Sequence, residues 1–280
     1  MAHDLPEGHT RITLGLGYEG SLYRGWQTQP CGQTIQDTLQ QALHHFVGRP
    51  CMAVCAGRTD TGVHALQQVV HIDTPVQRSQ QSWVRGLNSA LPDTIRVQWA
   101  HPVSEGFHAR FSARSRTYLY VVRNHPIASP FMAKRVGWVY RPLQLAPMQA
   151  AARSLVGHHD FSSFRSSQCQ ATHPNRTLHQ LDIIEQAPYF LFVFHANAFL
   201  HHMVRNIMGA LISIGQARHS PEWISDLLEQ RDRRLAAPTF AASGLYLADV
   251  NYPADHGLPR QPWSERLHAL TGISIDAPRI

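Results

Sequence analysis

The chain has a single lysine, Lys134, and the other 24 of its 25 basic residues are arginine. With one lysine and no Gly-x-x-x-x-Gly-Lys segment, the sequence excludes a P-loop nucleotide hydrolase and argues against a Schiff-base enzyme. Charged residues make up only 16% of the chain, below the roughly 25% of an average soluble domain, while 43% of the residues are hydrophobic. The sequence therefore predicts a globular chain with a packed core.

Cysteine pairs and long apolar runs are also missing. The four cysteines include no Cys-x-x-Cys pair, so the sequence indicates neither a zinc ribbon nor a disulfide scaffold. The first ten residues contain Asp4 and Glu7 and lack an apolar core, which argues against a signal peptide. No apolar run approaches the roughly 18 residues of a membrane span. We therefore expect a cytoplasmic protein with reduced thiols and no membrane association.

The charge that is present is mostly of one sign. The net charge is +6 and the isoelectric point is near 9.5. Arginine, unlike lysine, offers a planar fork that binds phosphates and carboxylates through two hydrogen bonds. The excess of arginine over acidic residues thus favours an anionic partner. The alternative is a protein surface that is basic without binding such a partner.

Hydrophobic periodicity predicts strands and helices that are mixed along the whole chain. The expected strands are residues 11–18, 51–55, 67–73, 95–99, 117–123, 178–185, 189–196 and 245–250. The expected helices are residues 34–48, 79–91, 147–155, 201–214 and one that begins at 220–221. In the first helix, Thr34 and Asp37 have the spacing of a capping box. We also expect Ser220 and Pro221 to start the last helix, with proline at its first position.

This mixture predicts an α+β fold of two similar domains, each a mainly antiparallel sheet with helices on one face. We expect residues 1–106 to form the N-terminal domain and residues 107–252 the C-terminal domain. Residues 253–280 are expected to be a peripheral, proline-rich tail.

The segment 56–65, Ala-Gly-Arg-Thr-Asp-Thr-Gly-Val-His-Ala, is the most informative stretch. Gly57 and Gly62 bracket Arg58 and Asp60 in a short connection between two expected strands, which directs both side chains to one place. A guanidinium beside a carboxylate keeps the acid ionised and available as a nucleophile or base. The alternative is an Arg-Asp turn that only satisfies backbone hydrogen bonds.

This segment resembles the catalytic motif of the tRNA pseudouridine synthase A family. Further matching segments follow in the family's order, at residues 18–20, 25–30, 34–36, 107–113 with Tyr118, 159–165, 199–206 and 244–247. The resemblance covers about residues 11–252. Glu19 and Thr61 stand where many relatives carry aspartate and alanine, and the tail beyond Pro253 has no counterpart.

The resemblance implies isomerisation of uridine to pseudouridine at positions 38, 39 and 40 in the anticodon stem and loop of tRNA. The reaction breaks the N1–C1′ bond, rotates the uracil and joins C5 to C1′, and it needs neither a metal nor a cofactor. The family also implies the pseudouridine synthase fold, with an active-site cleft between the two domains. A homodimer is implied as well, in which one tRNA touches both subunits.

The resemblance also assigns roles to individual residues. Asp60 matches the essential nucleophile, and its target, C1′, C6 or a ribose proton, stays open. Tyr118 matches the aromatic that stacks on the target base, and Arg205 the second basic partner of the aspartate. Leu245 is expected to form an apolar wall of the uracil pocket, and Arg58 to pair with Asp60 and fill the space of the flipped base. Each of these residues also has a purely structural alternative. Tyr118 would pack inside a strand, Arg205 would lie on a solvated helix face, and Leu245 would be part of the core.

Contacts with RNA are expected to use phosphates and shape, because an A-form helix hides its base edges. The expected substrate-binding residues are Arg78, Phe107, His108, Ala109, Arg110, Phe111 and Gln168, with Gln168 in the loop 166–170. Further arginine candidates are Arg24, Arg114, Arg116 and Arg165.

Two other functions remain possible. A metallohydrolase is suggested by the histidines at 158–159 and 201–202. Neighbouring residues on a strand point to opposite faces, however, and on a helix they diverge by about 100°, so neither pair is expected to supply two ligands. The other alternative is an RNA-binding module without catalytic activity.

Overall fold

The computed structural model describes residues 5–260 and 262–271. These residues form two compact units. The first comprises the described parts of Met1–Arg114 and Leu247–Ile280, and the second comprises Ser115–Tyr246. The chain therefore leaves the first unit and returns to it. The division into domains at residues 106 and 252 stays a prediction.

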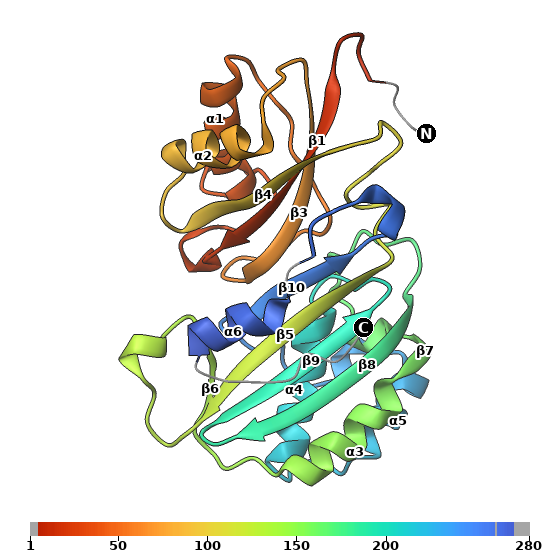
Figure 1. Ribbon diagram of the computed structural model, residues 1–280. Helices are drawn as coiled ribbons and strands as arrows, with labels where there is room; N and C mark the ends of the chain where they lie inside the picture. The colour runs from red at the N-terminus through yellow and green to blue at the C-terminus, as the bar shows by residue number, and fades with distance from the viewer. Residues whose placement is uncertain (1–4, 261, 272–280) are drawn as a thin grey trace. The chain divides into compact units, whose positions relative to one another are not determined.

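The strands of unit 1 form an antiparallel arrangement around β1 (Figure 1). Its strands are β1 (Thr10–Tyr18), β2 (Val54–Cys55), β3 (His64–Thr74), β4 (Ile95–Val103) and the part of β10 (Leu245–Asn251) from Leu247 onward. Their order is β4-β1-β3-β10, and β2 pairs with β3. In β1, the core side chains Ile12, Leu14 and Leu16 alternate as the sequence predicts.

The helices of unit 1 are α1 (Ile35–Val47), α2 (Gln80–Ala90) and α6 (Trp263–Thr271). The predicted cap of α1 is confirmed, because the backbone N–H of Asp37 donates to Oγ1 of Thr34 at 3.1 Å. Helix α2 packs against α1 and β4, and α6 packs against β3. The tail residues Trp263 and Leu267 are buried. Part of the proline-rich tail is therefore a core helix of this unit.

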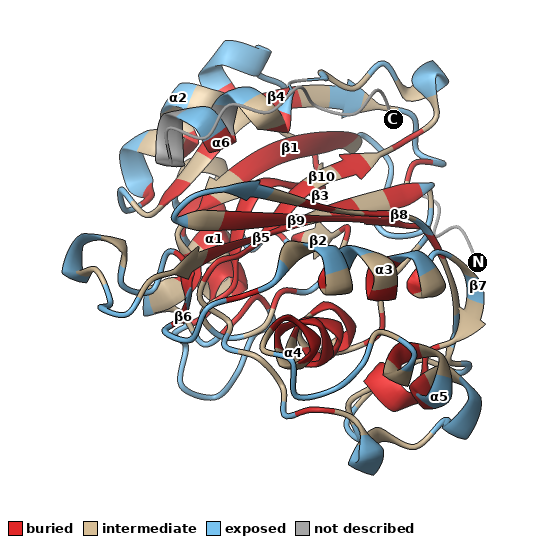
Figure 2. Ribbon diagram, turned by 90° about the horizontal axis from the view of Figure 1, so that it is seen from below, coloured by how far each residue is buried: buried red, intermediate tan, exposed pale blue. Residues whose placement is uncertain are grey.

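Unit 2 has a second set of strands covered by helices. Its strands are β5 (Ser115–Asn124), β6 (Gly137–Val139), β7 (Gly157–Asp160), β8 (Asn175–Gln186) and β9 (Tyr189–Ala196), in the order β5-β9-β8-β7. The pairs β5/β9, β8/β9 and β7/β8 are antiparallel, whereas β6 runs parallel to β5. Helices α3 (Leu145–Leu155), α4 (Met203–Gly215) and α5 (Trp223–Gln230) lie on one face of these strands (Figures 1 and 2). The α+β class with a mixed, mostly antiparallel arrangement is thus confirmed.

Several element boundaries differ from the prediction. The strand expected at residues 51–55 spans only Val54–Cys55, and the short strands β6 and β7 were not predicted. The helix expected from residue 220 begins at Trp223, because Ser220 and Pro221 form a turn that accepts hydrogen bonds from the N–H groups of Trp223 and Ile224. Sequence periodicity cannot separate such a turn from a first helical turn, since both place the same donors and acceptors.

Short 3-10 helices connect the main elements, at Gly20–Leu22, Pro130–Met132, Ser162–Phe164, Arg233–Leu235 and Ala254–His256. In the part of the chain that is described, no helix has the length and apolar character that crossing a membrane requires.

Candidate active site

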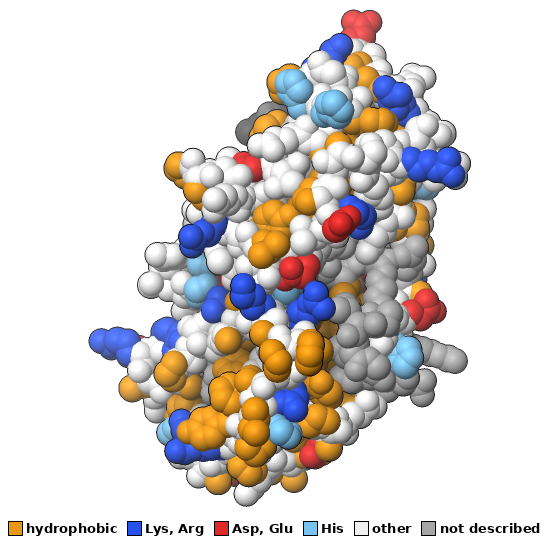
Figure 3. Space-filling model, turned by 90° about the vertical axis from the view of Figure 1, so that its left-hand side faces the viewer, with side chains coloured by type: hydrophobic (Ala, Val, Ile, Leu, Met, Phe, Trp, Pro, Cys, Tyr) orange, Lys and Arg blue, Asp and Glu red, His pale blue; other side chains and the backbone are white. Residues whose placement is uncertain are grey.

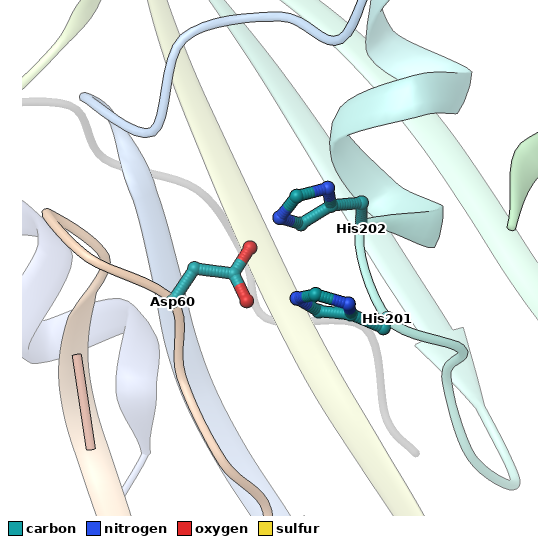
Figure 4. A group of neighbouring side chains, drawn as sticks. All are labelled: Asp60, His201 and His202. Atoms are coloured by element: carbon teal, nitrogen blue, oxygen red, sulfur yellow. The ribbon is translucent and has the colours of Figure 1, made fainter. Parts of the chain in front are cut away.

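Asp60 lies in a turn between β2 and β3, and the turn is fixed from both sides. The N–H of Trp26 donates to the carbonyl of Thr59 at 2.9 Å, and the Oγ1 of Thr59 lies 2.8 Å from the Tyr18 hydroxyl. On the other side of Arg58, Nε2 of Gln68 donates to the carbonyl of Gly57 at 2.7 Å. The carboxylate is half-buried and stands out from this turn (Figure 4). The backbone around Asp60 is thus held in one conformation before any substrate arrives.

Glycines allow the neighbouring loop to approach this turn. Gly25 has φ +87°, and a Cβ on it would lie 2.8 Å from the carbonyl oxygen of Thr59. A Cβ on Gly20 would lie 1.9 Å from the carbonyl oxygen of Val63. Both positions therefore require glycine for space, and the first requires it for its backbone angle as well. The matching segments at 18–20 and 25–30 thus support the Asp60 turn.

His64 joins the same support. Its Nδ1 accepts the N–H of Gly20 at 3.1 Å and lies 3.7 Å from a carboxylate oxygen of Glu19. That carboxylate also accepts the N–H of Ser21. The supporting roles of Gln68 and His64 were not predicted from the sequence. The available signal is a glutamine and a histidine inside an otherwise apolar strand, because a buried amide or imidazole needs a hydrogen-bond partner.

Arg58 and Arg78 both lie in unit 1 with exposed side chains. The guanidinium of Arg78 lies 4.6 Å from the centroid of the Phe46 ring, a cation–π contact that restricts where the charge points. Phe46 in turn packs edge-on against the buried Trp83 at 5.2 Å. Arg78 is therefore anchored to the helix layer of its unit.

The expected RNA-binding segment 107–111 divides into buried and exposed residues. Phe107 and Ala109 are fully buried, so their side chains offer no surface to a partner. His108 is half-buried, and Arg110 and Phe111 are exposed, with 76% of Phe111 accessible. The rings of His108 and Phe111 are 4.3 Å apart, and the Arg110 guanidinium lies 5.6 Å from the Phe111 ring.

The side chain of Arg11 fixes the backbone at the start of this segment. Its guanidinium binds both carboxylate oxygens of Asp73, at 2.7 and 2.8 Å. It also donates to the carbonyls of Glu105 and Phe107, both at 2.6 Å. Only 8% of Arg11 is exposed. The sequence gives no indication of this role, because an arginine at the start of a strand carries no signal of its partners.

Two further groups hold the carbonyl and the N–H of Ala109. The N–H donates to Nδ1 of His71 at 3.1 Å, and the Tyr252 hydroxyl donates to the carbonyl at 2.5 Å. Burial, reinforced by the Arg11 charge, lowers the pKa of His71 from 6.5 to about 4. Burial also lowers the pKa of His108. Both rings are therefore neutral at pH 7, and His71 keeps its acceptor nitrogen.

In unit 2, Tyr118 lies on β5 opposite Phe194 of β9. The side chain is half-buried, while Thr117 and Leu119 on either side are buried. Its ring meets Phe199 edge-on, with the centroids 5.0 Å apart. Tyr118 is therefore more accessible than its neighbours on β5.

Arg205 is a half-buried residue of α4. Its Nε donates to the carbonyl of Phe240 at 3.0 Å, and its own carbonyl accepts the N–H of Phe240. The next residue, Asn206, is fully buried and accepts hydrogen bonds from Thr239 and Arg233, at 2.6 and 3.1 Å. The loop after Arg233 is thus tied to the helix at Arg205.

Leu245 is 96% buried at the start of β10, as expected for an apolar wall and equally for a core leucine. The chain reaches it through Gly244, which has φ +88° and whose carbonyl accepts the N–H of Val121 at 2.9 Å. A Cβ at Gly244 would lie 2.4 Å from the carbonyl oxygen of Val121, so the close approach of the two backbones requires glycine.

The loop 166–170 is shaped by Arg165. Its Nη2 donates to the carbonyls of Cys169 and Ala171, at 2.9 and 2.8 Å, so this arginine serves the loop backbone. Gln168 is exposed at the tip. Burial alone would raise the pKa of Cys169, but hydrogen bonds from the N–H groups of Ala171 and His201 and the charge of Arg165 outweigh it and lower the pKa.

The histidine pairs behave differently from each other. His158 and His159 lie on β7, and their rings contact Thr177 and the carbonyl of Val156, respectively, as alternation on a strand predicts. The expected divergence of His201 and His202 is wrong, because α4 begins only at Met203 and His202 has φ 63°. Their rings lie side by side, 4.0 Å apart (Figure 4).

The chain is similar to known proteins over most of its length. The family model of tRNA pseudouridine synthase matches residues 17–112 and 151–253. The tRNA pseudouridine synthase A of Bordetella parapertussis is 59% identical over 250 residues, which cover 89% of this chain and 93% of that protein. The protein of the same name from Paraburkholderia xenovorans is 54% identical over 259 residues, which cover 91% and 96%. The chain therefore belongs to the tRNA pseudouridine synthase family.

Proposed function

We propose that this isomerase converts uridine to pseudouridine at positions 38, 39 and 40 in the anticodon stem and loop of tRNAs, with Asp60 as the nucleophile. Membership of the family supports the coarser part, isomerisation of uridine in tRNA. One observation carries the assignment of Asp60. The motif residues occur in a turn whose backbone is held at Gly57 and Thr59, on the N-terminal side of the carboxylate.

The reaction detaches uracil from C1′, rotates it and forms the C5–C1′ bond, after which C5 loses its proton and N1 takes up a proton from solvent. The product has the same atoms as the substrate, so no oxidant, reductant or group donor is consumed. The Asp60 carboxylate acts on C1′, on C6 or on a ribose proton. A primary isotope effect on tRNA deuterated at the ribose separates the third route from the other two. A rigid turn suits each route, because it fixes the distance between carboxylate and sugar in advance.

Tyr118 is assigned to stacking on the target base, and its phenol to removal of the C5 proton. A half-buried ring suits the first role. Arg205 is assigned to the second cation that keeps the Asp60 carboxylate ionised. Leu245 is assigned to the apolar wall that retains the free uracil, which water would otherwise solvate.

The target uridine must leave its stack, at a cost of a few kcal/mol. We assign Arg58 to the vacated space, because its exposed, planar guanidinium can both stack and pair. Arg58→Lys is then not conservative. Single-turnover modification at the wild-type rate by that variant would rule this role out.

The proposed RNA surface of unit 1 combines Arg78 with the exposed part of residues 107–111, and that of unit 2 contains Gln168. About six phosphate contacts give a log-log salt slope of about −4 to −5, since each contact contributes roughly −0.7 to −0.9. A flat response of tRNA affinity to salt would remove this phosphate-contact model.

The test is tritium release from tRNA labelled at uridine C5, followed by mapping of the modified position. Asp60→Ala is expected to bind tRNA and to release no tritium, whereas a pure RNA-binding module would release none even as wild type. Release by Asp60→Ala would show that this assignment is wrong.

The metallohydrolase alternative predicts loss of activity in excess chelator, whereas the proposed reaction runs without a metal. We further propose a homodimer that acts in the cytoplasm and a catalytic cleft between two domains. Sedimentation analysis at several concentrations tests the dimer. These features follow from the family resemblance and stay predictions.

A further inference from the structure

The sequence between Glu105 and Asp160 has an unusual charge balance. It contains eight Lys and Arg residues and no Asp or Glu. Four of these cations lie within residues 123–141, on the end of β5, the following loop and β6. The sequence of this part of unit 2 therefore supplies cations and no acidic residue, and a polyanion is the partner that this balance fits.

The same stretch exposes large apolar side chains. The exposed fractions are 87% for Phe131, 72% for Ile127, 53% for Tyr140 and 44% for Trp138. Figure 1 shows the segment projecting from unit 2 beside β6, in yellow-green. On the face drawn in Figure 3, hydrophobic side chains gather in one region, and Lys and Arg side chains lie among and beside them. We call Ile127, Phe131, Trp138, Tyr140 and Arg141 the aromatic loop patch.

Hydrogen bonds hold the part of the patch that lies on and after β6. The indole N–H of Trp138 donates to the carbonyl of His125 at 2.8 Å. The side-chain amide of Asn124 donates to the carbonyls of Val139 and Arg141, at 2.8 and 2.7 Å. Trp138 and Tyr140 alternate with the buried Val139, so both rings point to the open side of β6. Their centroids are 6.1 Å apart.

Arg141 places a charge against one of these rings. Its guanidinium carbon lies 5.6 Å from the centroid of Tyr140, and its Nε donates to the Tyr140 hydroxyl at 3.0 Å. Unpaired RNA binds to surfaces that combine aromatic rings with arginines. Its bases stack on the rings, while its phosphates contact the cations. A second copy of this chain on the same patch would bring like charges together, which opposes association.

We propose that the aromatic loop patch binds an unpaired loop of the RNA substrate, as a contact surface separate from the residues assigned above. The proposal rests on the proposed function, because it takes tRNA as the ligand. It uses the charge, the exposed rings and the fixed geometry of unit 2 alone.

The test compares tRNA affinity among matched variants of the full chain. Phe131→Ser/Tyr140→Ser removes two exposed rings, and Arg141→Gln removes the charge. Leu235→Ser and Arg153→Gln are the controls, because both residues are exposed on unit 2 outside the patch. We expect the patch variants to weaken tRNA binding at least tenfold and the controls less than twofold. Tyr140→Phe keeps the ring and is expected to bind within threefold of wild type.

Three results would overturn the proposal. The first is tRNA binding by the patch variants within twofold of wild type. The second is an equal loss of affinity for a perfect RNA duplex, which offers no unpaired base. The third is a lower molecular mass of the patch variants at equal concentration, which would make the patch a contact between copies. Tritium release by the wild type on the same tRNA separates failure of this proposal from failure of the proposed function.

Discussion

Replacing Arg11 with methionine removes the charge that holds residues 105–107. Methionine keeps much of the side-chain length, so the change tests the guanidinium more than the packing. The variant loses two hydrogen bonds to the Asp73 carboxylate and two to the carbonyls of Glu105 and Phe107. Arg11 is almost completely buried, and its partner carboxylate is 33% exposed.

The expected cost follows from these exposures. Breaking a fully buried ion pair costs about 3–5 kcal/mol, because the remaining charge stays buried and unpaired. Water reaches the Asp73 carboxylate in part, which lowers that cost. The two carbonyls lose charged donors, however, which adds to it. We therefore expect a loss of about 3 kcal/mol from a free energy of unfolding that is typically about 5–15 kcal/mol.

Urea unfolding followed by circular dichroism measures this change. The matched control is Arg96→Met, because Arg96 is 40% exposed and pairs with Asp93, which is 99% exposed. Like Arg11, it also donates to backbone carbonyls, those of Leu91, Pro92 and Ile95, so the two variants differ mainly in the burial of the ion pair. Exposed pairs of this kind contribute about 0–1 kcal/mol. Asp73→Asn and the double variant complete a cycle, in which the pair is expected to be coupled by more than about 1 kcal/mol.

Equal losses of stability in Arg11→Met and Arg96→Met would contradict the expected cost. A cycle in which the effects of the Arg11 and Asp73 changes simply add would contradict it as well. A cost near 3 kcal/mol together with weaker tRNA binding would link the anchor to the exposed residues Arg110 and Phe111, which its loop carries.

The remaining predictions concern pH, a close contact and a buried amide. The pKa of His71 is lowered to about 4, so the unfolded chain binds more protons than the folded chain between pH 6.5 and 4. Stability therefore falls as pH decreases through that window, by about 3 kcal/mol in total for this group. Urea unfolding of wild type and His71→Gln at pH 7 and pH 4.5 measures this, and an equal loss of stability in both proteins between the two pH values would contradict it. Gly20→Ala places a Cβ 1.9 Å from the Val63 carbonyl, and we expect about 1–3 kcal/mol lower stability with slower tritium release. The control is Gly106→Ala, where the space is open, and this change is expected to alter release little. Asn206→Ala leaves Arg233, Thr239 and the Phe164 carbonyl without their shared partner, and a loss of about 2–4 kcal/mol is expected in thermal unfolding, while an unchanged melting temperature would refute it.

Local sequence determined the secondary structure where one signal dominated. The Thr34 cap, the apolar stripe and Gly48 with φ 81° define α1 without any other part of the chain. Strand β9 spans the predicted residues 189–196, because its continuous apolar run allows no other boundary. The short strands β6 and β7 were missed, since three or four residues carry too little pattern and owe their conformation to pairing with β5 and β8.

The candidate site shows the same division. The motif around Asp60 was evident from the sequence, because two glycines, an arginine and an aspartate stand together. The contacts that fix it were not, because Tyr18 and Gln68 come from separate strands and meet Thr59 and Gly57 only in the fold. For the same reason, the sequence placed Phe107 among the substrate-binding residues, and the structure buries its side chain.

The scarcity of lysine and the richness in arginine came from the sequence alone, and so did the anionic partner that they predict. Tertiary structure decided what individual arginines do. Arg11 and Arg165 bind backbone carbonyls within their own units, whereas Arg141 lies against an exposed ring. A guanidinium has five donors, and a carbonyl, a carboxylate or a phosphate can accept from them. Its task therefore depends on which acceptors the folded chain brings within reach, and no local pattern in the sequence encodes that.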